Sequence, residues 1–472
     1  MVFSSLSFLY VFLPAVLLVY YLVPAKAKNA VLLFFSLVFY YVGEQSRVWI
    51  MGASSLLDFC CALIIDTHRE KKGLCRLALA ASLCGNLGLL AYFKYADLII
   101  EGINAVSGAG LKPLKVALPI GISFYTFQTM SYTADVYRGS RAQRNFLDFA
   151  CYVTLFPQLI AGPIVRYADV VHELPAAARK ADILRWEKGI RRFCLGLGKK
   201  VILANSLAEL VKLTDSAAAP VLLCWLGALA APLQIYFDFS GYSDMAIGLG
   251  HLLGFSFPEN FDHPFASRSA TEFWQRWHMT LGGWFRDYLY IPLGGSRVGP
   301  LRLVFNLMLV WSVTGLWHGA SVNFILWGVY YGILIVIERF ALKKLLDKPH
   351  PAARILSRAY LLLLSVFGFQ IFNAADLADI GVRLGRLFGA GSRAFSSVTA
   401  LYYCRSYAPL VLLSLLLSLP WGQDLYHRLC AKSERASAIL RLAADLLALA
   451  LLIVSTAYLV DGSYNPFLYF RF

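Results

Sequence analysis

Long apolar stretches recur along the whole sequence and approach the roughly 20 residues with which an α-helix crosses the hydrocarbon core of a bilayer. They lie near residues 5–24, 29–43, 48–65, 77–93, 116–136, 148–165, 220–237, 303–319, 323–341, 358–373, 407–420 and 441–460. The polar residues between them are too few to cover a soluble protein of 472 residues, since 59% of the residues are hydrophobic, 15% are charged and the mean hydropathy is +0.62. The sequence therefore predicts an all-α polytopic integral membrane protein with roughly 11–12 transmembrane helices.

The excess of basic residues gives a formal net charge of +15 at pH 7, and the location of these residues indicates which partner they bind. They fall in short loops between the apolar stretches, as the positive-inside rule expects, without the aromatic residues and motifs of a nucleic-acid-binding domain. We expect membrane lipid, and no nucleic acid, as the partner of this charge. The nine cysteines form no C-x-x-C pair and mostly lie within apolar stretches, so we predict neither a disulfide framework nor a metal site.

The charges in the loops also predict how the chain crosses the membrane. Lys26 and Lys28 follow the first apolar stretch, and no basic residue precedes it, so we expect a retained first helix with the N-terminus outside the cytoplasm. Basic residues in the loop 427–441 precede the last stretch, so the C-terminus is also expected outside.

Each crossing of the membrane should move the next loop to the opposite side, but this alternation of loops fails at residues 148–165. The following segment, 166–200, is rich in Lys and Arg and belongs inside, yet a single crossing would place it outside. Pro157 and Gly162-Pro163 interrupt the stretch, so we predict a broken or re-entrant helix. Irregular backbone at membrane depth is tolerated only where protein or a water-filled cavity surrounds it. The sequence thus predicts re-entrant or broken helices around a central funnel.

We expect one transmembrane domain over residues 1–472. Its parts are N-terminal helices at 5–110, a catalytic core at 115–345, and C-terminal helices with an aromatic tail at 346–472.

Polar residues enter the membrane-like sequence in three segments of this core. The segments are 237–244, 273–295 and 314–320. His318 ends an apolar stretch between Gly315 and Gly319, which allow other backbone or a substrate to come close. An imidazole in a low dielectric tends to stay neutral, which is the state that a general base needs. A structural histidine bonded across helices is the alternative, and intramembrane ionisable residues leave both open.

Several motifs in these segments are long enough to compare with known families. They are Trp317-His318-Gly319-Ala320 with Trp327-Gly328, Arg276-Trp277-His278 with Trp284 to Gly295, Phe237 to Asp244, Gly121 to Gln128, and Phe156 to Ile164. Together they closely resemble the membrane-bound O-acyltransferases, and the resemblance runs from the N-terminus to the last residues. More narrowly, the chain looks like the branch that contains the alginate O-acetyltransferase membrane subunit, with the peptidoglycan O-acetylation proteins and the teichoic acid D-alanyl transfer protein among its relatives. Two positions depart from it: Tyr331 stands where many relatives have His, and Gly282 where a small hydroxylated residue is frequent.

The resemblance implies that His318 is the catalytic histidine and His278 the second histidine of the site, in a funnel that the acyl donor enters from the cytoplasm. His318 would take the proton from an attacking hydroxyl, and His278 would bind the acyl oxygen or orient the acceptor. A structural bond to the region of Arg286 and Asp287 is the alternative for His278. Further residues expected to line the donor and acceptor funnel are Asp238, Asp244, Arg276, Trp277, Arg286, Asp287 and Trp317. The two aspartates have a structural role as their alternative, and Arg276 and Arg286 either steer an anionic donor or are ordinary basic residues.

The aromatic tail, residues 465–472, contains one nucleophilic hydroxyl, that of Tyr469. An interfacial aromatic anchor is the simple interpretation of the tail. Similar C-terminal motifs in related envelope acylation systems suggest instead that Tyr469 is a possible acyl acceptor. A phenol is a weak nucleophile near neutral pH, so it would need activation by His318.

The resemblance predicts an O-acyltransferase of the bacterial cytoplasmic (inner) membrane that O-acetylates an extracytoplasmic polysaccharide such as alginate. The donor would be a thioester substrate, acetyl-CoA or an acyl-carrier phosphopantetheine, with no bound cofactor. Because the sequence contains no G-x-S-x-G elbow, we expect an extracytoplasmic esterase-like acetyltransferase as a partner, with a cytoplasmic acyl donor protein as a further one. The alternatives are D-alanyl or peptidoglycan acyl transfer by the same mechanism, a polysaccharide or lipid transporter, and a scaffold without catalysis.

Overall fold

The structure is a computed structural model that describes residues 1–216, 218–346, 350–391 and 393–462. Helices form its regular structure, and Phe261 and Trp277 form an isolated antiparallel bridge. The longer helices are α1 (Leu13–Leu22), α2 (Lys28–Glu44), α3 (Val48–Thr67), α4 (Lys72–Leu90), α5 (Ala96–Ser107), α6 (Ile122–Tyr137), α7 (Phe146–Thr154), α10 (Ile183–Gly198), α11 (Asn205–Thr214), α12 (Val221–Leu253), α15 (Pro300–His318), α16 (Val322–Ile337), α18 (Pro351–Asn373), α19 (Leu377–Leu387), α20 (Val398–Leu417), α21 (Trp421–Cys430) and α22 (Glu434–Asp461). Short helices are α8 (Phe156–Leu159), α9 (Tyr167–Val170), α13 (Ala270–Arg276), α14 (Met279–Phe285) and α17 (Lys343–Leu346).

Within the described residues, nine helical runs are long and apolar enough to cross a membrane. They are Ala25–Glu44, Val48–Thr67, Lys72–Ser107, Val221–Leu253, Pro300–His318, Val322–Leu346, Pro351–Asn373, Val398–Leu417 and Glu434–Asp461. Three other predicted stretches form shorter elements: the apolar helix Phe8–Leu22, α6 with 16 residues, and the broken segment around α7 and α8. The all-α polytopic fold is therefore confirmed, and the chain is a multi-pass membrane protein.

The chain packs into two compact units that alternate along the sequence. The first unit comprises Met1–Phe193 and Tyr242–Pro258, and the second comprises Cys194–Gly241 and, among the described residues, 259–462. Helices α10 and α12 each contribute residues to both units.

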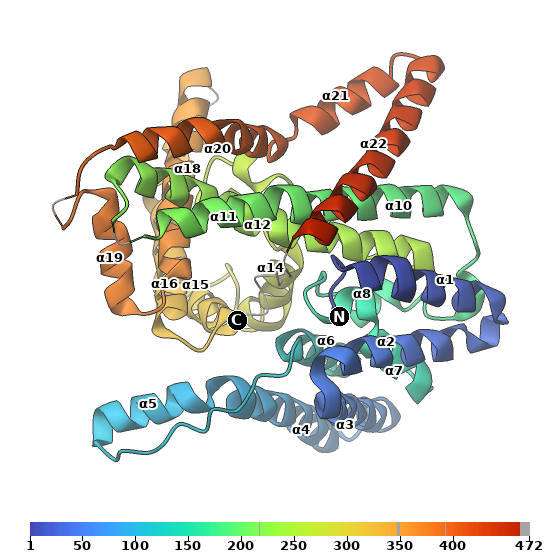
Figure 1. Ribbon diagram of the computed structural model, residues 1–472. Helices are drawn as coiled ribbons and strands as arrows, with labels where there is room; N and C mark the ends of the chain where they lie inside the picture. Colours follow the sequence, from blue (N-terminus) through green and yellow to red (C-terminus); the bar gives the residue numbers. More distant parts are fainter. Residues whose placement is uncertain (217, 347–349, 392, 463–472) are drawn as a thin grey trace. The chain divides into compact units, whose positions relative to one another are not determined.

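In the first unit, α3, α4 and α6 pack against one another (Figure 1). A buried carboxylate connects them. Asp58 of α3 accepts hydrogen bonds from Ser82 and from the Asn86 amide of α4, the latter at 2.7 Å, and from the Thr133 hydroxyl of α6 at 3.2 Å. A buried polar group in a membrane protein needs such partners, because lipid supplies none. These bonds connect the three helices.

The first unit also contains the break that the prolines and glycine predict. Helix α7 ends at Thr154, Leu155 leaves the helical region at φ −52° and ψ 110°, and α8 lasts only four residues. The Tyr152 hydroxyl donates to the Val165 carbonyl at 3.0 Å, and the Gln158 amide donates to the Tyr152 carbonyl at 2.7 Å. Side chains of the protein therefore donate hydrogen bonds to carbonyl groups of this irregular backbone. Irregular backbone in a membrane protein needs such partners, because lipid supplies none.

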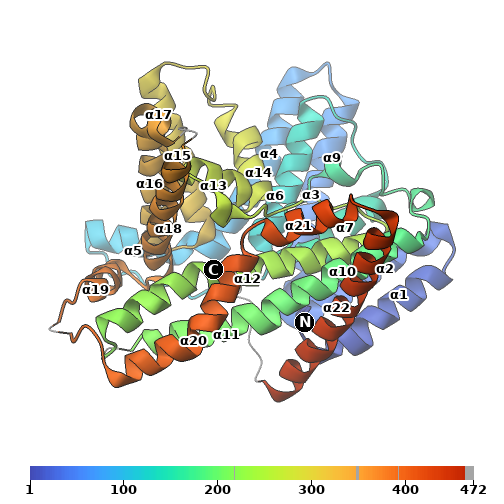
Figure 2. The same cartoon turned by 90° about the horizontal axis from the view of Figure 1, so that it is seen from above.

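In the second unit, α15, α16 and α18 lie side by side and form the frame of the site (Figures 1 and 2). Gly315 of α15 and Gly328 of α16 face each other at the α15–α16 contact: a Cβ on Gly315 would lie 2.2 Å from the Phe324 carbonyl oxygen, and one on Gly328 would lie 2.2 Å from that of Trp311. Only glycine allows two helix backbones to approach so closely.

Candidate active site

His318 is the last residue of α15, and its ring is enclosed by aromatic side chains from three helices. The ring centroid lies 5.0 Å from that of Trp317 on α15, 5.0 Å from that of Trp327 on α16, and 5.5 Å from that of Phe372 on α18. Only 5% of His318 is exposed. This aromatic shell keeps water away from the imidazole and holds its plane, since all three contacts are edge-to-face.

The two glycines that flank His318 have different neighbours. Gly315 admits the backbone of α16, as described above, and a Cβ on Gly319 would lie 2.2 Å from the ring of Phe324. The expectation that other backbone comes close at this point is therefore confirmed for Gly315. At Gly319 the neighbour is a side chain.

His278 precedes α14 as its N-cap residue and has a left-handed backbone conformation, with φ +45° and ψ 51°. Such a conformation is uncommon for a residue with a side chain and persists only where the surroundings impose it. The ring is held from two sides: Nδ1 lies 3.0 Å from Oδ1 of Asn260, and the ring centroid lies 4.7 Å from that of Phe239. Burial lowers the pKa of His278 well below its usual value, and a charge on His318 acts in the same direction.

The two histidines share one neighbour, the indole of Trp317. Its ring centroid lies 5.0 Å from that of His318 and 5.9 Å from that of His278. The structure thus brings His278, His318 and Trp317 together in the second unit, as the sequence predicts for a site with two histidines. Two buried imidazoles at this point can exchange protons with a hydroxyl.

Trp277 lies in the core beside this pair. It is 4% exposed, stacks on Phe273 at 5.4 Å, and contacts Phe369 of α18 at 5.4 Å. Its ring therefore packs the segment that carries His278 against α18.

Asp238 and Asp244 each form an ion pair with a basic residue from the segment 166–200. Asp238 lies 2.5 Å from the ammonium of Lys200 in the π-helical turn Lys199–Ala204, and both side chains are at most 5% exposed. In the first unit, Asp244 lies 2.7 Å from the guanidinium of Arg192. These contacts favour the structural interpretation of the two carboxylates. They also show that part of the basic segment pairs with carboxylates on α12.

Arg276, Arg286 and Asp287 are engaged with other charged residues. Arg276 lies 2.9 Å from Glu272, one turn earlier in α13, and Arg286 lies 2.7 Å from Asp287. The Arg286 side chain is 64% exposed and that of Arg276 is 34% exposed, so both reach a surface of the unit. Neither Arg286 nor Asp287 is the partner of His278 Nδ1, which is Asn260.

Sequence reasoning missed Asn260 and the role of Lys200. Asn260 lies in a loop 18 residues before His278, and a lone asparagine in a loop gives no signal of a catalytic contact. Lys200 looks like one more charge of a basic loop, because nothing in the sequence indicates that its side chain turns into the core. Tyr469 lies outside the described residues, so its role stays a prediction.

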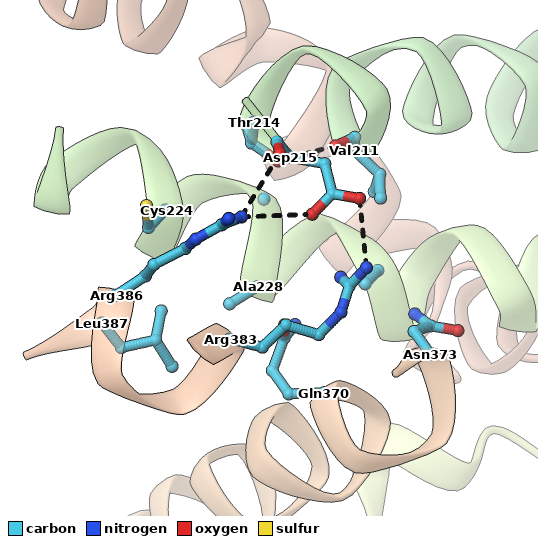
Figure 3. A pocket seen from close by; sticks show the side chains of 12 residues that line it. Val211, Thr214, Asp215, Cys224, Ala228, Gln370, Asn373, Arg383, Arg386 and Leu387 are labelled. Atoms are coloured by element: carbon cyan, nitrogen blue, oxygen red, sulfur yellow. Dashed lines mark hydrogen bonds and ion pairs between the residues drawn. The ribbon is translucent and has the colours of Figure 1, made fainter. Parts of the chain in front are cut away.

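A small polar pocket of about 30 Å³ lies elsewhere in the second unit (Figure 3). Asp215, just after α11, lies between Arg383 and Arg386 of α19, at 3.1 Å and 3.6 Å. A volume of this size holds roughly one water molecule. The pocket therefore attaches α19 to the unit and is too small for a sugar or a thioester.

Comparison with known proteins shows which family the chain is similar to. The family model for MBOAT, the membrane-bound O-acyltransferase family, matches residues 37–373, a range that includes both histidines. The chain is 37% identical over 490 residues to the "Probable alginate O-acetylase AlgI" of Pseudomonas putida, with all of both chains covered. It is 33% identical to the peptidoglycan O-acetyltransferase of Helicobacter pylori, over 72% of this chain and 70% of that one. It is 30% identical to the teichoic acid D-alanyltransferase of Bacillus subtilis, over 47% of this chain and 59% of that one.

A family model that spans most of the helices, and a relative that aligns along the entire length, leave little of the chain outside the match. With two buried histidines in its second unit, this O-acyltransferase belongs to the membrane-bound O-acyltransferase family.

Proposed function

We propose that this enzyme transfers an acetyl group from a cytoplasmic thioester for O-acetylation of an extracytoplasmic polysaccharide, of which alginate is the first candidate. The observation that carries the proposal is a pair of buried imidazoles, His278 and His318, that both contact the indole of Trp317. The chain that contains them is similar along its whole length to a probable alginate O-acetylase. The alternative is acyl transfer to peptidoglycan, or transfer of D-alanyl groups, by the same mechanism. It is supported by the similarity to a peptidoglycan O-acetyltransferase and to a teichoic acid D-alanyltransferase.

In the proposed reaction, His318 takes the proton of the acceptor hydroxyl while the oxygen attacks the acyl carbon. The carbon–sulfur bond of the thioester breaks, and the thiolate leaves and gains a proton. His278 binds the acyl oxygen or orients the acceptor. General base catalysis of this kind is worth roughly 10²–10⁴-fold in rate.

The dry environment of His318 supports this role. Three aromatic rings exclude water, so a thioester held there would meet the acceptor rather than hydrolyse. The donor is acetyl-CoA or a phosphopantetheine-bearing carrier protein. We assign Asp238 and Arg276 a structural role in this proposal, because each forms an ion pair within the second unit.

The proposed location is the bacterial inner membrane, with both termini outside the cytoplasm. Tyr469 is proposed as an intermediate acyl acceptor, and a separate extracytoplasmic esterase-like acetyltransferase would carry the acyl group to the sugar. Replacement of Tyr469 by Phe keeps the aromatic ring and removes the hydroxyl, so undiminished acylation in that variant would rule out this intermediate.

The test of the function is His318→Ala in cells that export the polymer. We expect the polymer to be exported at a normal level with its O-acetyl content lost. Loss of the polymer itself would indicate a transporter, and unchanged acetylation would indicate a scaffold. Asn306→Ala is the matched control for a buried polar residue of α15 that contacts the 293–295 loop, and it should retain more acetylation than His318→Ala.

A further inference from the structure

The contacts of Asn260 determine which nitrogen of His278 carries the proton. Asn260 is completely buried, and its Oδ1 accepts the backbone N–H of Thr280 at 3.4 Å and the Thr280 hydroxyl at 2.9 Å. A backbone N–H is always a donor, so the Asn260 atom that faces Thr280 must be the oxygen. The orientation of the amide is thereby fixed.

The same oxygen lies 3.0 Å from Nδ1 of His278. Because a carbonyl oxygen only accepts, Nδ1 must be the donor and must carry the proton. In a neutral imidazole the other nitrogen then holds a lone pair. Nε2 of His278 is therefore an acceptor.

The backbone around this contact is also fixed. The N–H of Met279 donates to the Asn260 carbonyl at 2.9 Å, and the N–H of Asp262 donates to the Arg276 carbonyl at 2.9 Å, next to the bridge between Phe261 and Trp277. The left-handed backbone of His278 lies between these bonds. The strand-like pairing thus holds the ring in place while the Asn260 side chain selects its tautomer.

We propose that Asn260 is a positioning residue that locks His278 as its Nδ1–H tautomer, so that Nε2 accepts a hydrogen bond from the acceptor hydroxyl. This inference rests on the proposed function and decides between the two roles of His278. A neutral imidazole without a proton on Nε2 cannot donate to the acyl oxygen, so it orients the acceptor. Proton transfer from the hydroxyl remains with His318.

The His278 ring also has neighbours on other helices. From the elements packed against it, the ring meets Phe239 of α12 and Trp317 of α15, and His318 is the titratable group that acts on it. A positive charge on His318 disfavours a second proton on His278. The neutral tautomer is therefore the state that matters for the reaction.

The test is ¹⁵N NMR of the ring nitrogens in the full-length protein, labelled at histidine and held in lipid nanodiscs, with His278→Gln used to assign the signal. We expect a protonated Nδ1 and a non-protonated Nε2 in the wild type. Asn260→Leu should mix the two tautomers, and Asn260→Asp should raise the pH at which His278 gains its second proton, because a carboxylate now faces Nδ1. Thr280→Val, which keeps the backbone N–H, should leave the wild-type tautomer in place.

A protonated Nε2 in the wild-type protein, or an unchanged tautomer in Asn260→Leu, would overturn the inference. In cells, Asn260→Leu should lower the O-acetyl content of the polymer at least roughly tenfold, since a wrong histidine tautomer costs up to roughly 10⁴-fold in serine proteases. The NMR result does not depend on activity. Should His318→Ala keep its acetylation, the proposed function would fail while the tautomer assignment would stand.

Discussion

Replacement of Gly315 by Ala should damage the site through the backbone of a neighbouring helix. The new Cβ would lie 2.2 Å from the carbonyl oxygen of Phe324 and 3.0 Å from its carbon, whereas Cβ atoms essentially never come within 3.0 Å of another heavy atom. Helices α15 and α16 would have to separate by about 0.8 Å at this point. The obstacle is backbone, so no rotamer change relieves it, and overpacking of this kind costs about 1–3 kcal/mol.

The separation matters for the reaction because His318 lies three residues after Gly315, within one turn of α15. A displacement near 1 Å in the position of a catalytic group can cost roughly 10²-fold in rate. We therefore expect Gly315→Ala to reach the membrane but to lose roughly 10- to 100-fold in acyl transfer. The assay is the O-acetyl content of the exported polymer, together with thermal unfolding of the purified protein in detergent.

Two other glycines provide controls for a helical Gly→Ala change. A Cβ on Gly282 in α14 would lie 3.7 Å from its nearest neighbour, the Trp274 carbonyl oxygen, and a Cβ on Gly88 in α4 would have nothing within 4 Å. Alanine at either position should be tolerated and should stabilise the helix by about 0.5–1 kcal/mol. Wild-type acetylation and wild-type thermal stability in Gly315→Ala would refute the argument from the α15–α16 contact.

Lys200→Met should destabilise the protein by about 3–5 kcal/mol, because it leaves the Asp238 carboxylate buried without its ammonium. The double variant Lys200→Met, Asp238→Leu should unfold at a higher temperature than the single one, and a double variant as unstable as the sum of the two single changes would contradict a direct pair. In α19, burial opposes the ionisation of Asp379, but the hydrogen bond and charge of Arg383 outweigh it and hold the pKa of Asp379 below its usual value. Because its pKa is lowered in the folded protein, the Asp379 carboxylate stabilises the fold above the pKa of an unfolded aspartate, which is about 3.9. This stability is lost as the pH falls below that value, so proteolysis of the segment 377–387 should accelerate below about pH 4. Asp379→Asn should remove this acid dependence, and equal acid sensitivity in that variant would assign it to another group.

The fold class could be predicted from the sequence because the thickness of the bilayer's hydrocarbon core sets the length of a transmembrane helix. Apolar stretches of about that length can be recognised in the sequence alone. The break at 148–165 was predictable for a similar reason, since Pro157 and Gly162 interrupt a helix wherever they occur. The number of full spans was harder to predict. Residues 116–136 are apolar enough to suggest a crossing, but α6 begins only at Ile122 and has 16 residues.

His318 and His278 could be singled out from the sequence because they lie in long motifs. Their partners could not, because contacts between distant residues depend on how the helices pack. Lys200 and Asp238 are 38 positions apart, and Asn260 is separated from His278 by a short helix and a loop. A lysine in a basic segment and an asparagine in a loop look the same in sequence whether they face solvent or the core.

Helix α16 connects the supports of both histidines. Through Gly328 it packs against α15, which ends in His318. Just past its C-terminus, Glu338 is buried, with its carboxylate accepting the backbone N–H groups of Ala270 at 2.6 Å and Thr271 at 2.9 Å. Those groups begin α13, which leads directly to His278. A carboxylate at a helix N-terminus is favoured by the unsatisfied N–H groups and the helix dipole. One helix thus sets the position of α15 by close backbone contact and that of α13 by charge, so a displacement of α16 would change the distance between the two imidazoles.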